Sequence, residues 1–232
     1  MDVAAVLLAG GRSVRMGRDK PLLEIADETL VERHVRQLRA IGVHNIVLVS
    51  NAANRRAICE HTGLQTMVQR GHGMSAAVRT GLDAARGFDA VFLVCVNDLI
   101  LDEDYGALGR TTVEEGLVIP TVRLDRVFHG GMLELAGDEV RGIVEKPDGG
   151  CPAGAAANIM IHRVAGARTI RDLRNRLRSA CEYEAAINAM IAAGLRTMAV
   201  PVAFWLAIKN PEDYMEAERR LSRNPGEALR TA

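Results

Sequence analysis

Apolar runs of strand length, separated by segments with the periodicity of helices, constrain the fold of this 232-residue chain more than any other feature. Apolar residues recur at the spacing of one helix face in 28–42 and in 74–87, and a glycine closes each segment. Strands that are apolar along their whole length are typical of a sheet covered by helices on both faces. The pattern therefore predicts a three-layer, doubly wound α/β fold. The strand-length runs are 3–9, 45–50, 64–68, 90–96 and 116–122.

The second half of the chain follows a different pattern. From about residue 123, short apolar stretches surround a turn at Gly137-Asp138, and the stretch AAANIMIHR (155–163) reads as a further strand. No linker rich in proline or serine precedes this part, so we expect a small inserted β-rich lobe (about 123–163) within a single domain (1–222). Two helices in 165–194, a strand in 196–203 and a helix capped by Asn210 should follow. The polar residues 223–232 are expected to fray.

Composition and charge exclude several classes of function. The chain has 29 basic and 29 acidic residues and only 3% aromatic residues, whereas nucleic-acid binders combine a basic surface with aromatic stacking. No apolar run approaches about 18 residues, so no membrane span is expected. The N-terminus lacks the basic segment of a secretory signal, and the four cysteines lack the spacing of zinc sites or of a disulfide framework. We therefore expect a protein of the reducing cytoplasm, monomeric or homodimeric.

The segment LLAGGRSVRMGRDKPLLEI (7–25) joins an apolar strand to a Gly-Gly pair and then to four basic residues. Adjacent glycines let the backbone approach a ligand closely, and the N–H groups that follow can point at phosphate oxygens. The spacing is neither that of Gly-x-Gly-x-x-Gly nor that of a Walker loop. From these residues alone, the segment is either a tight turn with solvated charges or a cradle for phosphates.

Taken whole, this segment resembles the signature of the nucleotidyltransferase superfamily that makes nucleoside-diphosphate sugars, and of its molybdenum-cofactor relatives. The resemblance implies a Rossmann-like fold with a mixed sheet. Arg15 and Lys20 would be catalytic, gripping a nucleoside triphosphate and stabilising charge on the transferred group and the departing pyrophosphate. Ser13-Val14 replaces the Gly-Thr of many sugar-type members, which makes the loop similar to the molybdenum-cofactor branch. The backbone that would hold the nucleotide is that of Leu8, Ala9, Gly10 and Gly11.

An acidic residue follows another strand-like run in VFLVCVNDLILDEDY (91–105). Such a position is costly unless the residue is a cap or a metal ligand. By the resemblance, Asp98 would be catalytic and would bind Mg²⁺ against the α-phosphate, with Asn97 in place of the usual glycine. The resemblance places a second metal ligand where this chain has Ala207. The metal would then rest on Asp98, water and phosphates, with Asn210 or Asp213 helping, or activity would be reduced.

Two further segments match the family in order. MVQRGHGMSAAVRTGL (67–82) resembles its base-recognition loop, with Gln69 reading a base edge and Ser75 capping a helix, although a glycine-rich turn explains it equally well. The segments GGMLEL (130–135), EKP (145–147) and AAANIMIHR (155–163) resemble the acceptor-binding half of the sugar nucleotidyltransferases. By itself, a Glu-Lys pair is usually a surface ion pair. The nucleotide-binding candidates here are Gln69, Gly73 and Ser75, and the acceptor-binding candidates are Gly131, Glu145, Lys146 and Asn158.

Together these motifs predict a Mg²⁺-dependent nucleotidyltransferase. It would transfer a nucleoside monophosphate from a triphosphate to a sugar 1-phosphate, or a similar small phosphorylated alcohol, and release pyrophosphate. No pairing of serine or cysteine with histidine stands out, so we expect direct attack without a covalent intermediate. Two alternatives stay open: a molybdopterin-type nucleotidyltransferase, which Glu145-Lys146-Pro147 disfavours, and a nucleotide-binding regulatory protein without catalysis, which Ala207 favours.

Overall fold

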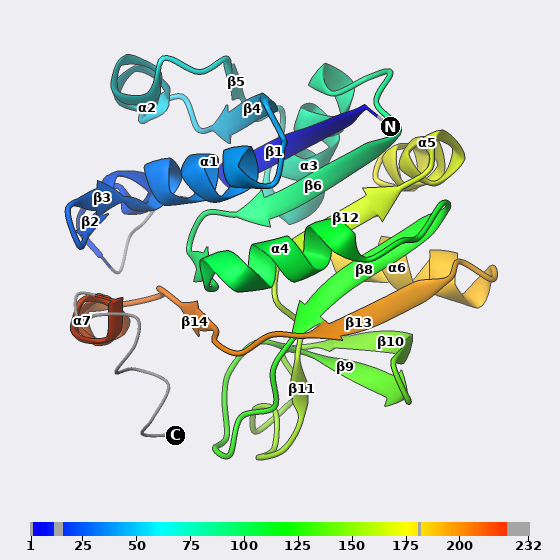
Figure 1. Ribbon diagram of the computed structural model, residues 1–232. Coiled ribbons are helices and arrows are strands. Elements are labelled where there is room, and N and C mark those ends of the chain that lie inside the picture. The colour runs from blue at the N-terminus through cyan, green and yellow to red at the C-terminus, as the bar shows by residue number, and fades with distance from the viewer. Residues whose placement is uncertain (1, 12–15, 181, 222–232) are drawn as a thin grey trace.

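A mixed β-sheet forms the centre of the protein in the computed structural model (Figure 1). The structure describes residues 2–11, 16–180 and 182–221. The strands β6, β1, β4 and β5 run parallel, so their carboxyl ends meet at one edge, and the predicted α/β class is confirmed. The order across the sheet is β11 (Ala156–Ala157), β9 (Gly131–Ala136), β10 (Glu139–Glu145), β13 (Thr197–Pro201), β8 (Gly116–Thr121), β12 (Ile161–Ala165), β6 (Ala90–Cys95), β1 (Val3–Ala9), β4 (Asn45–Ser50) and β5 (Thr66–Val68).

Helices cover both faces of this sheet. On one face lie α1 (Leu30–Ala40) and α4 (Asp102–Arg110), and on the other lie α3 (Gly73–Ala84), α5 (Ala167–Arg176) and α6 (Tyr183–Ala192) (Figure 1). Alternate side chains of β1 enter the two cores, Val6 with the second group of helices and Leu7 with the first. The short helix α2 (Arg55–Thr62) adds Ile58 to the Leu7 core. Burial on both faces explains why the strands are apolar along their whole length.

Helix α1 begins later than its sequence predicts, and helix α3 begins earlier. The helix expected over 28–42 starts at Leu30, because 28–29 form the strand β3 (Glu28–Thr29), which pairs with β2 (Glu24–Ile25). The side chain of Thr29 then caps α1. Helix α3 starts at Gly73, whose φ of 80° turns the chain into the helix. Ser75 therefore lies inside the first turn of α3 and is not its cap, which corrects that prediction.

The predicted β-rich insert is continuous with the main sheet. Strands β9, β10 and β11 extend the sheet through the antiparallel contact of β10 with β13. The stretch AAANIMIHR, predicted as one strand, forms two: β11 pairs with β9, whereas β12 lies between β6 and β8. Between them the N–H of Asn158 donates to the carbonyl of Gly131 at 2.8 Å before the chain crosses to the middle of the sheet. The single-strand prediction is wrong because an apolar run does not reveal that its two ends have different neighbours.

The C-terminal segment closes over the N-terminal one. Strand β14 (Leu206–Ala207) pairs with β7 (Asp98–Leu99), and α7 (Pro211–Leu221) lies beside β2 (Figure 1). Asn210 caps α7 as predicted, because its Oδ1 accepts a hydrogen bond from the N–H of Asp213 at 2.9 Å. The tail 223–232 lies outside the described residues. No helix in the described ranges is long and apolar enough to cross a membrane. A small core joins the two ends of the chain through Leu23, Ile25, Leu30, Leu99, Leu206, Ile208 and Ala217.

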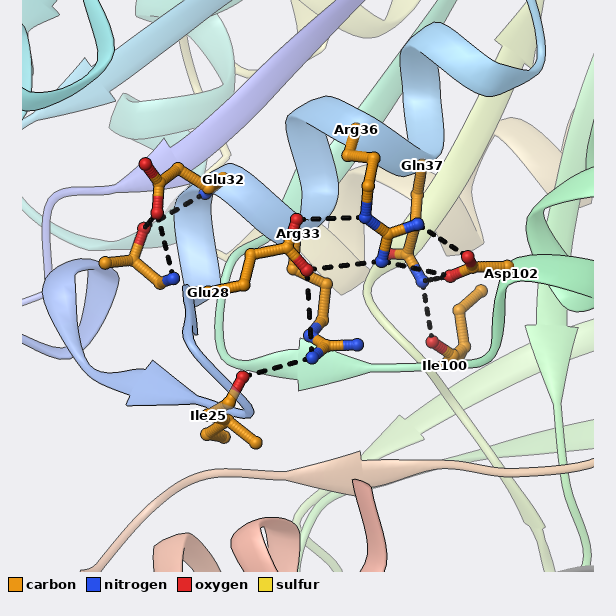
Figure 2. Close-up of polar contacts among 9 residues, drawn as sticks. Ile25, Glu28, Glu32, Arg33, Arg36, Gln37, Ile100 and Asp102 are labelled. Atoms are coloured by element: carbon orange, nitrogen blue, oxygen red, sulfur yellow. Dashed lines mark hydrogen bonds and ion pairs between the residues drawn. The ribbon is translucent and has the colours of Figure 1, made fainter. Parts of the chain in front are cut away.

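Helix α1 holds the β2–β3 hairpin and the segment after β6 in place, as Figure 2 shows. Arg36 bridges two carboxylates, Glu28 at 2.9 Å and Asp102 at 2.5 Å. Gln37 donates to the carbonyl of Ile100 at 3.0 Å and to Asp102 at 2.8 Å. These contacts fix the backbone that leads from β6 through Asp98 into α4.

Candidate active site

The loop after β1 reaches the carboxyl edge of the parallel strands, where doubly wound folds bind their ligands. Two asparagines that follow β4 hold its backbone. Asn54 donates from Nδ2 to the carbonyl of Ala9 at 3.0 Å, and Asn51 donates to the carbonyl of Gly10 at 3.3 Å. These bonds fix the end of the predicted nucleotide loop, in which Leu8 is buried and Gly11 is exposed. Arg15 lies outside the described residues.

Gln69 packs against this loop. A Cβ atom on Gly10 would lie 2.7 Å from Oε1 of Gln69, so any larger residue there would push this side chain aside. The amide nitrogen of Gln69 donates to the carbonyls of Gly71 and Gly73 at 3.1 and 3.0 Å. Both amide hydrogens thus hold the glycine-rich loop before α3. In this arrangement Gln69 orders the loop, and its role in reading a base stays a prediction.

Asp98 is the buried carboxylate at this edge of the sheet. Its exposed fraction is 7%, and the indole N–H of Trp205 donates to its Oδ1 at 2.8 Å. Burial raises the pKa of Asp98 to about 6, although the Trp205 hydrogen bond and the ammonium groups of Lys209 and Lys20 act to lower it. Ala207 is the register partner of Asp98 in the β14–β7 pair. The position that the resemblance gives to a second metal ligand therefore lies directly beside the first.

Two lysines bring positive charge to Asp98. Lys20 begins a 3₁₀ turn, η1 (Lys20–Leu22), and donates from Nζ to the carbonyls of Ile208 and Lys209 at 2.9 and 3.1 Å. Lys209 donates from Nζ to the carbonyl of His129, and its Nζ lies 6.0 Å from the centroid of the Trp205 ring. Such cationic surroundings suit a ligand with several negative charges.

The predicted acceptor residues converge into one group, which we call the acceptor cluster: Gly131, Glu145, Lys146 and Asn158. Gly131 and Glu145 are register partners in β9 and β10. A Cβ atom on Gly131 would lie 2.6 Å from Oε2 of Glu145 and 3.2 Å from Nδ2 of Asn158. Lys146 pairs with Glu145 at 2.9 Å, and its φ of 44° is a strained conformation for a residue with a side chain. Glu145 also raises the pKa of Asp98, so the cluster acts electrostatically on that carboxylate.

The residues around Asp98 fit a magnesium ion that is held largely by its substrate. Mg²⁺ is usually bound through one or two carboxylates, with waters and substrate phosphates completing its coordination. No group of three or more His, Cys, Asp or Glu side chains in the described part of the chain could form an all-protein site. The bond from Trp205 uses one of about four lone-pair sites on the Asp98 carboxylate, which leaves room for a cation. Asp213, in contrast, accepts from the N–H groups of Lys209 and Asn210 at 2.8 and 3.1 Å.

Sequence reasoning missed four residues of this site: Asn51, Asn54, Trp205 and Lys209. The two asparagines lie in a polar stretch that reads as an ordinary turn, and only the fold brings them to the carbonyls of 9–10. Trp205 is the single tryptophan of the chain and precedes Ala207 by two positions, which is a signal that could have identified it. Lys209 carried no comparable signal.

Comparisons with known sequences identify relatives of this chain. The family model described as the MobA-like NTP transferase domain matches residues 5–121, half of the chain. A protein of Opitutus terrae assigned as a molybdenum cofactor guanylyltransferase is 46% identical over 56 residues, which are 24% of this chain and 28% of that protein. Another so assigned, from Peptoclostridium acidaminophilum, is 31% identical over 114 residues, 49% of this chain and 50% of that protein. The match spans no more than half the length of either curated relative.

Solved structures match nearly the whole chain. A Bacillus anthracis protein assigned as a glucose-1-phosphate thymidylyltransferase has a TM-score of 0.80 at 16% identity and covers 96% of each chain. The CTP:phosphocholine cytidylyltransferase of Streptococcus pneumoniae has a TM-score of 0.74 at 13% identity, over 95% of this chain and 100% of that one. At such identities these likenesses show the Rossmann-like fold. The family match adds the sequence relationship, and the chain therefore belongs to the family of MobA-like NTP transferase domains.

Proposed function

We propose that this protein is a Mg²⁺-dependent nucleotidyltransferase that joins the nucleoside monophosphate of a triphosphate to a sugar 1-phosphate, or a similar small phosphorylated alcohol, and releases pyrophosphate. The observation that carries the proposal is the acceptor cluster beside Asp98. Oε2 of Glu145 and Nδ2 of Asn158 face the same space next to Gly131. A carboxylate and an amide together suit hydroxyl groups, which both donate and accept hydrogen bonds.

The reaction would proceed by direct attack. An oxygen of the acceptor's phosphate attacks the α-phosphorus, a new P–O bond forms there, and the bond to the bridging oxygen breaks so that pyrophosphate leaves. Lys20, with Arg15 from the same loop, would stabilise the negative charge that develops on the leaving group. The acceptor cluster would hold the acceptor in line for attack. Asp98 would bind the magnesium ion, which when present neutralises charge on the phosphates.

A molybdopterin-type acceptor is a second candidate, because both curated relatives reported above are assigned as molybdenum cofactor guanylyltransferases. The acceptor cluster lies beyond residues 5–121, so the family match supports the nucleotide half and leaves the acceptor to be inferred from side chains. Those side chains favour a hydroxylated acceptor. A nucleotide-binding protein without catalysis is a third candidate, favoured by Ala207, which removes a carboxylate beside Asp98.

Pyrophosphate release separates these candidates. It is measured with Mg²⁺ for each common nucleoside triphosphate, against a panel of hexose 1-phosphates and against molybdopterin. We expect release with a hexose 1-phosphate. Release with molybdopterin alone would select the second candidate, and nucleotide binding without release would select the third.

Lys20→Ala tests the assignment of the triphosphate site. Loss of a positioned ammonium group should lower kcat by about 100-fold or more, with the fold retained on circular dichroism. Arg18→Ala is the matched control, because Arg18 is an exposed cation of the same segment and should leave kcat within about twofold. Turnover near wild type in Lys20→Ala would contradict the assignment.

A further inference from the structure

A buried chain of hydrogen bonds leads from α6 to the acceptor cluster. Tyr183 and His162 are both fully buried. The hydroxyl of Tyr183 lies 2.9 Å from Nδ1 of His162, and Nε2 of His162 lies 2.9 Å from Oδ1 of Asn158. Asn158 is half-buried, and its other amide atom, Nδ2, faces the space beside Gly131 and Glu145. His162 thus contacts the side of Asn158 that is turned away from the predicted acceptor.

The hydrogen bonds in this chain can run in two directions. Burial lowers the pKa of His162 to about 3, so the ring is neutral at physiological pH, with one nitrogen donating and the other accepting. In the first direction Tyr183 donates to Nδ1, and the Nε2–H group donates to Oδ1 of Asn158. In the second direction every donor and acceptor is exchanged, and Asn158 turns its oxygen toward Glu145.

The groups at the two ends favour the first direction. In the second, the Tyr183 hydroxyl would accept from His162, and its own hydrogen would need a further acceptor. Among the described residues, the hydrogen bond that the structure gives this hydroxyl is the one with His162. At the other end, the oxygen of Asn158 would face the carboxylate oxygen of Glu145, and two negatively polarised atoms would repel.

We propose that His162 is a positioning residue for acceptor recognition, whose Nε2–H group holds the Asn158 amide so that Nδ2 is presented to the acceptor as a donor. The inference rests on the proposed function, because the acceptor role of Asn158 belongs to it. It also narrows the substrate class. The acceptor must offer an oxygen that accepts from Asn158 close to a hydroxyl that donates to Glu145, as two neighbouring hydroxyl groups of a sugar or polyol do.

The tautomer of His162 can be measured directly in the full chain, whether or not any substrate is turned over. Two-bond ¹H–¹⁵N correlation spectra of ¹⁵N-histidine-labelled protein at pH 7.5 distinguish an Nε2–H ring from an Nδ1–H ring. His162→Gln identifies the signals through their disappearance. We expect a neutral Nε2–H tautomer. An Nδ1–H tautomer, or a protonated ring, would overturn the proposal.

Kinetics test the consequence for the acceptor. Tyr183→Phe keeps the aromatic ring but removes the hydroxyl that fixes the tautomer. We expect the KM for α-D-glucose 1-phosphate to rise about five- to tenfold, with the KM for the triphosphate unchanged and kcat within about twofold. An unchanged KM for glucose 1-phosphate would overturn the proposal.

Tyr105→Phe is the matched control. The Tyr105 hydroxyl lies 2.7 Å from Nδ1 of the buried His34, so the chain contains an equivalent pair in the core of the opposite sheet face. This variant should leave the KM for glucose 1-phosphate unchanged, and an equal rise in both variants would mean that the His162 chain is structural only. Failure of the proposed function has a different signature: no turnover by the wild-type protein together with the expected Nε2–H tautomer.

Discussion

Among single residues, Asp98 is the buried carboxylate of the candidate site, and its burial destabilises the fold whenever the carboxylate is charged. Its pKa in the native state is about 6, against an ordinary value of 3.8, because burial disfavours the charged form. A raised carboxyl pKa means that stability falls as the pH rises through this interval, since the native state holds the proton more tightly than the unfolded chain. At pH 7.5, Asp98→Asn removes the cost of burying a charged carboxylate. It should raise the free energy of unfolding by about 1–3 kcal/mol and abolish turnover.

Urea unfolding in the presence of EDTA measures this difference. Asp148→Asn is the control, because Asp148 is exposed and its substitution should change stability by less than about 0.5 kcal/mol. If Asp98→Asn is less stable than wild type, the contacts of the Asp98 carboxylate stabilise the fold by more than its burial destabilises it, and the prediction is wrong.

Some of these residues could be predicted from the sequence and others could not. Lys20, Asp98 and Glu145 stand in motifs whose order along the chain carries information, and the structure places their charges close enough to interact. The parts played by Asn54 and His162 depend on hydrogen bonds between segments that no local pattern specifies. Arg15 stays a prediction.

Between elements, the close approach of β9 to β10 and Asn158 makes Gly131 a sensitive position. A methyl group there would meet Oε2 of Glu145 at 2.6 Å and would displace the carboxylate. Gly131→Ala should therefore raise the KM for the acceptor about tenfold or more and leave the KM for the triphosphate unchanged, because misplacing a substrate-positioning group weakens its effect. Steady-state kinetics with each substrate varied in turn measure both constants.

Gly137→Ala provides the comparison. Gly137 has a φ of 65° at the turn between the same two strands, and nothing lies within 4 Å of a Cβ atom built on it. This variant should lose about 1 kcal/mol of stability with both KM values unchanged. Equal kinetic effects of the two substitutions would mean that strand stability, and not the position of Glu145, controls acceptor binding.

Elements buried on both faces were the most predictable. The expected strands 3–9 and 45–50 have the observed bounds of β1 and β4, because continuous apolar runs of that length suit a covered parallel sheet. The stretch 155–163 was less predictable, since its two halves pair with different strands and its apolar character is the same in both. The β7–β14 pair, with two residues from each segment, is too short to show any periodicity.

The contact of α1 with the segment after β6 should depend on pH. His34 is fully buried, its Nε2 lies 3.2 Å from the carbonyl of Val96, and burial lowers its pKa to about 4. The native protein therefore binds a proton at His34 less tightly than the unfolded chain does. The stability that depends on neutral His34 is complete above pH 6.5 and is lost as the pH falls toward 4. Between these values the loss should reach about 3 kcal/mol.

Comparing His34→Gln with wild type separates the contribution of His34 to the pH dependence of stability from that of Asp98. The raised pKa of Asp98 makes stability increase, not decrease, as the pH falls. Unfolding free energies between pH 7 and 4.5 should fall less steeply in His34→Gln, by up to about 1.4 kcal/mol per pH unit. The exposed His44→Gln should give a curve parallel to wild type. Parallel curves for all three proteins would contradict the assignment to His34.

Across the whole molecule, the C-terminal segment packs over residues 20–25, where we propose that the triphosphate binds. Ile208 is fully buried in the small core that joins the ends of the chain, and its carbonyl accepts from Lys20. Ile208→Ala should lower the free energy of unfolding by about 2–4 kcal/mol and raise the KM for the triphosphate, because the anchor of Lys20 loosens.

Met215→Ala is the control, because Met215 is 60% exposed. Its stability should stay within about 0.5 kcal/mol of wild type, with an unchanged KM. An unchanged KM in Ile208→Ala would show that the closing segment is structural only.

The central proposal is that one site brings two phosphorylated substrates together at Asp98. ³¹P NMR of the complete reaction tests it most directly. Wild-type protein, Mg²⁺, a nucleoside triphosphate and a hexose 1-phosphate should yield a nucleoside-diphosphate sugar and pyrophosphate in equal amounts, and Asp98→Asn should yield neither. If no such pair of products forms with any triphosphate and acceptor, although the triphosphate binds, the proposed transfer is contradicted.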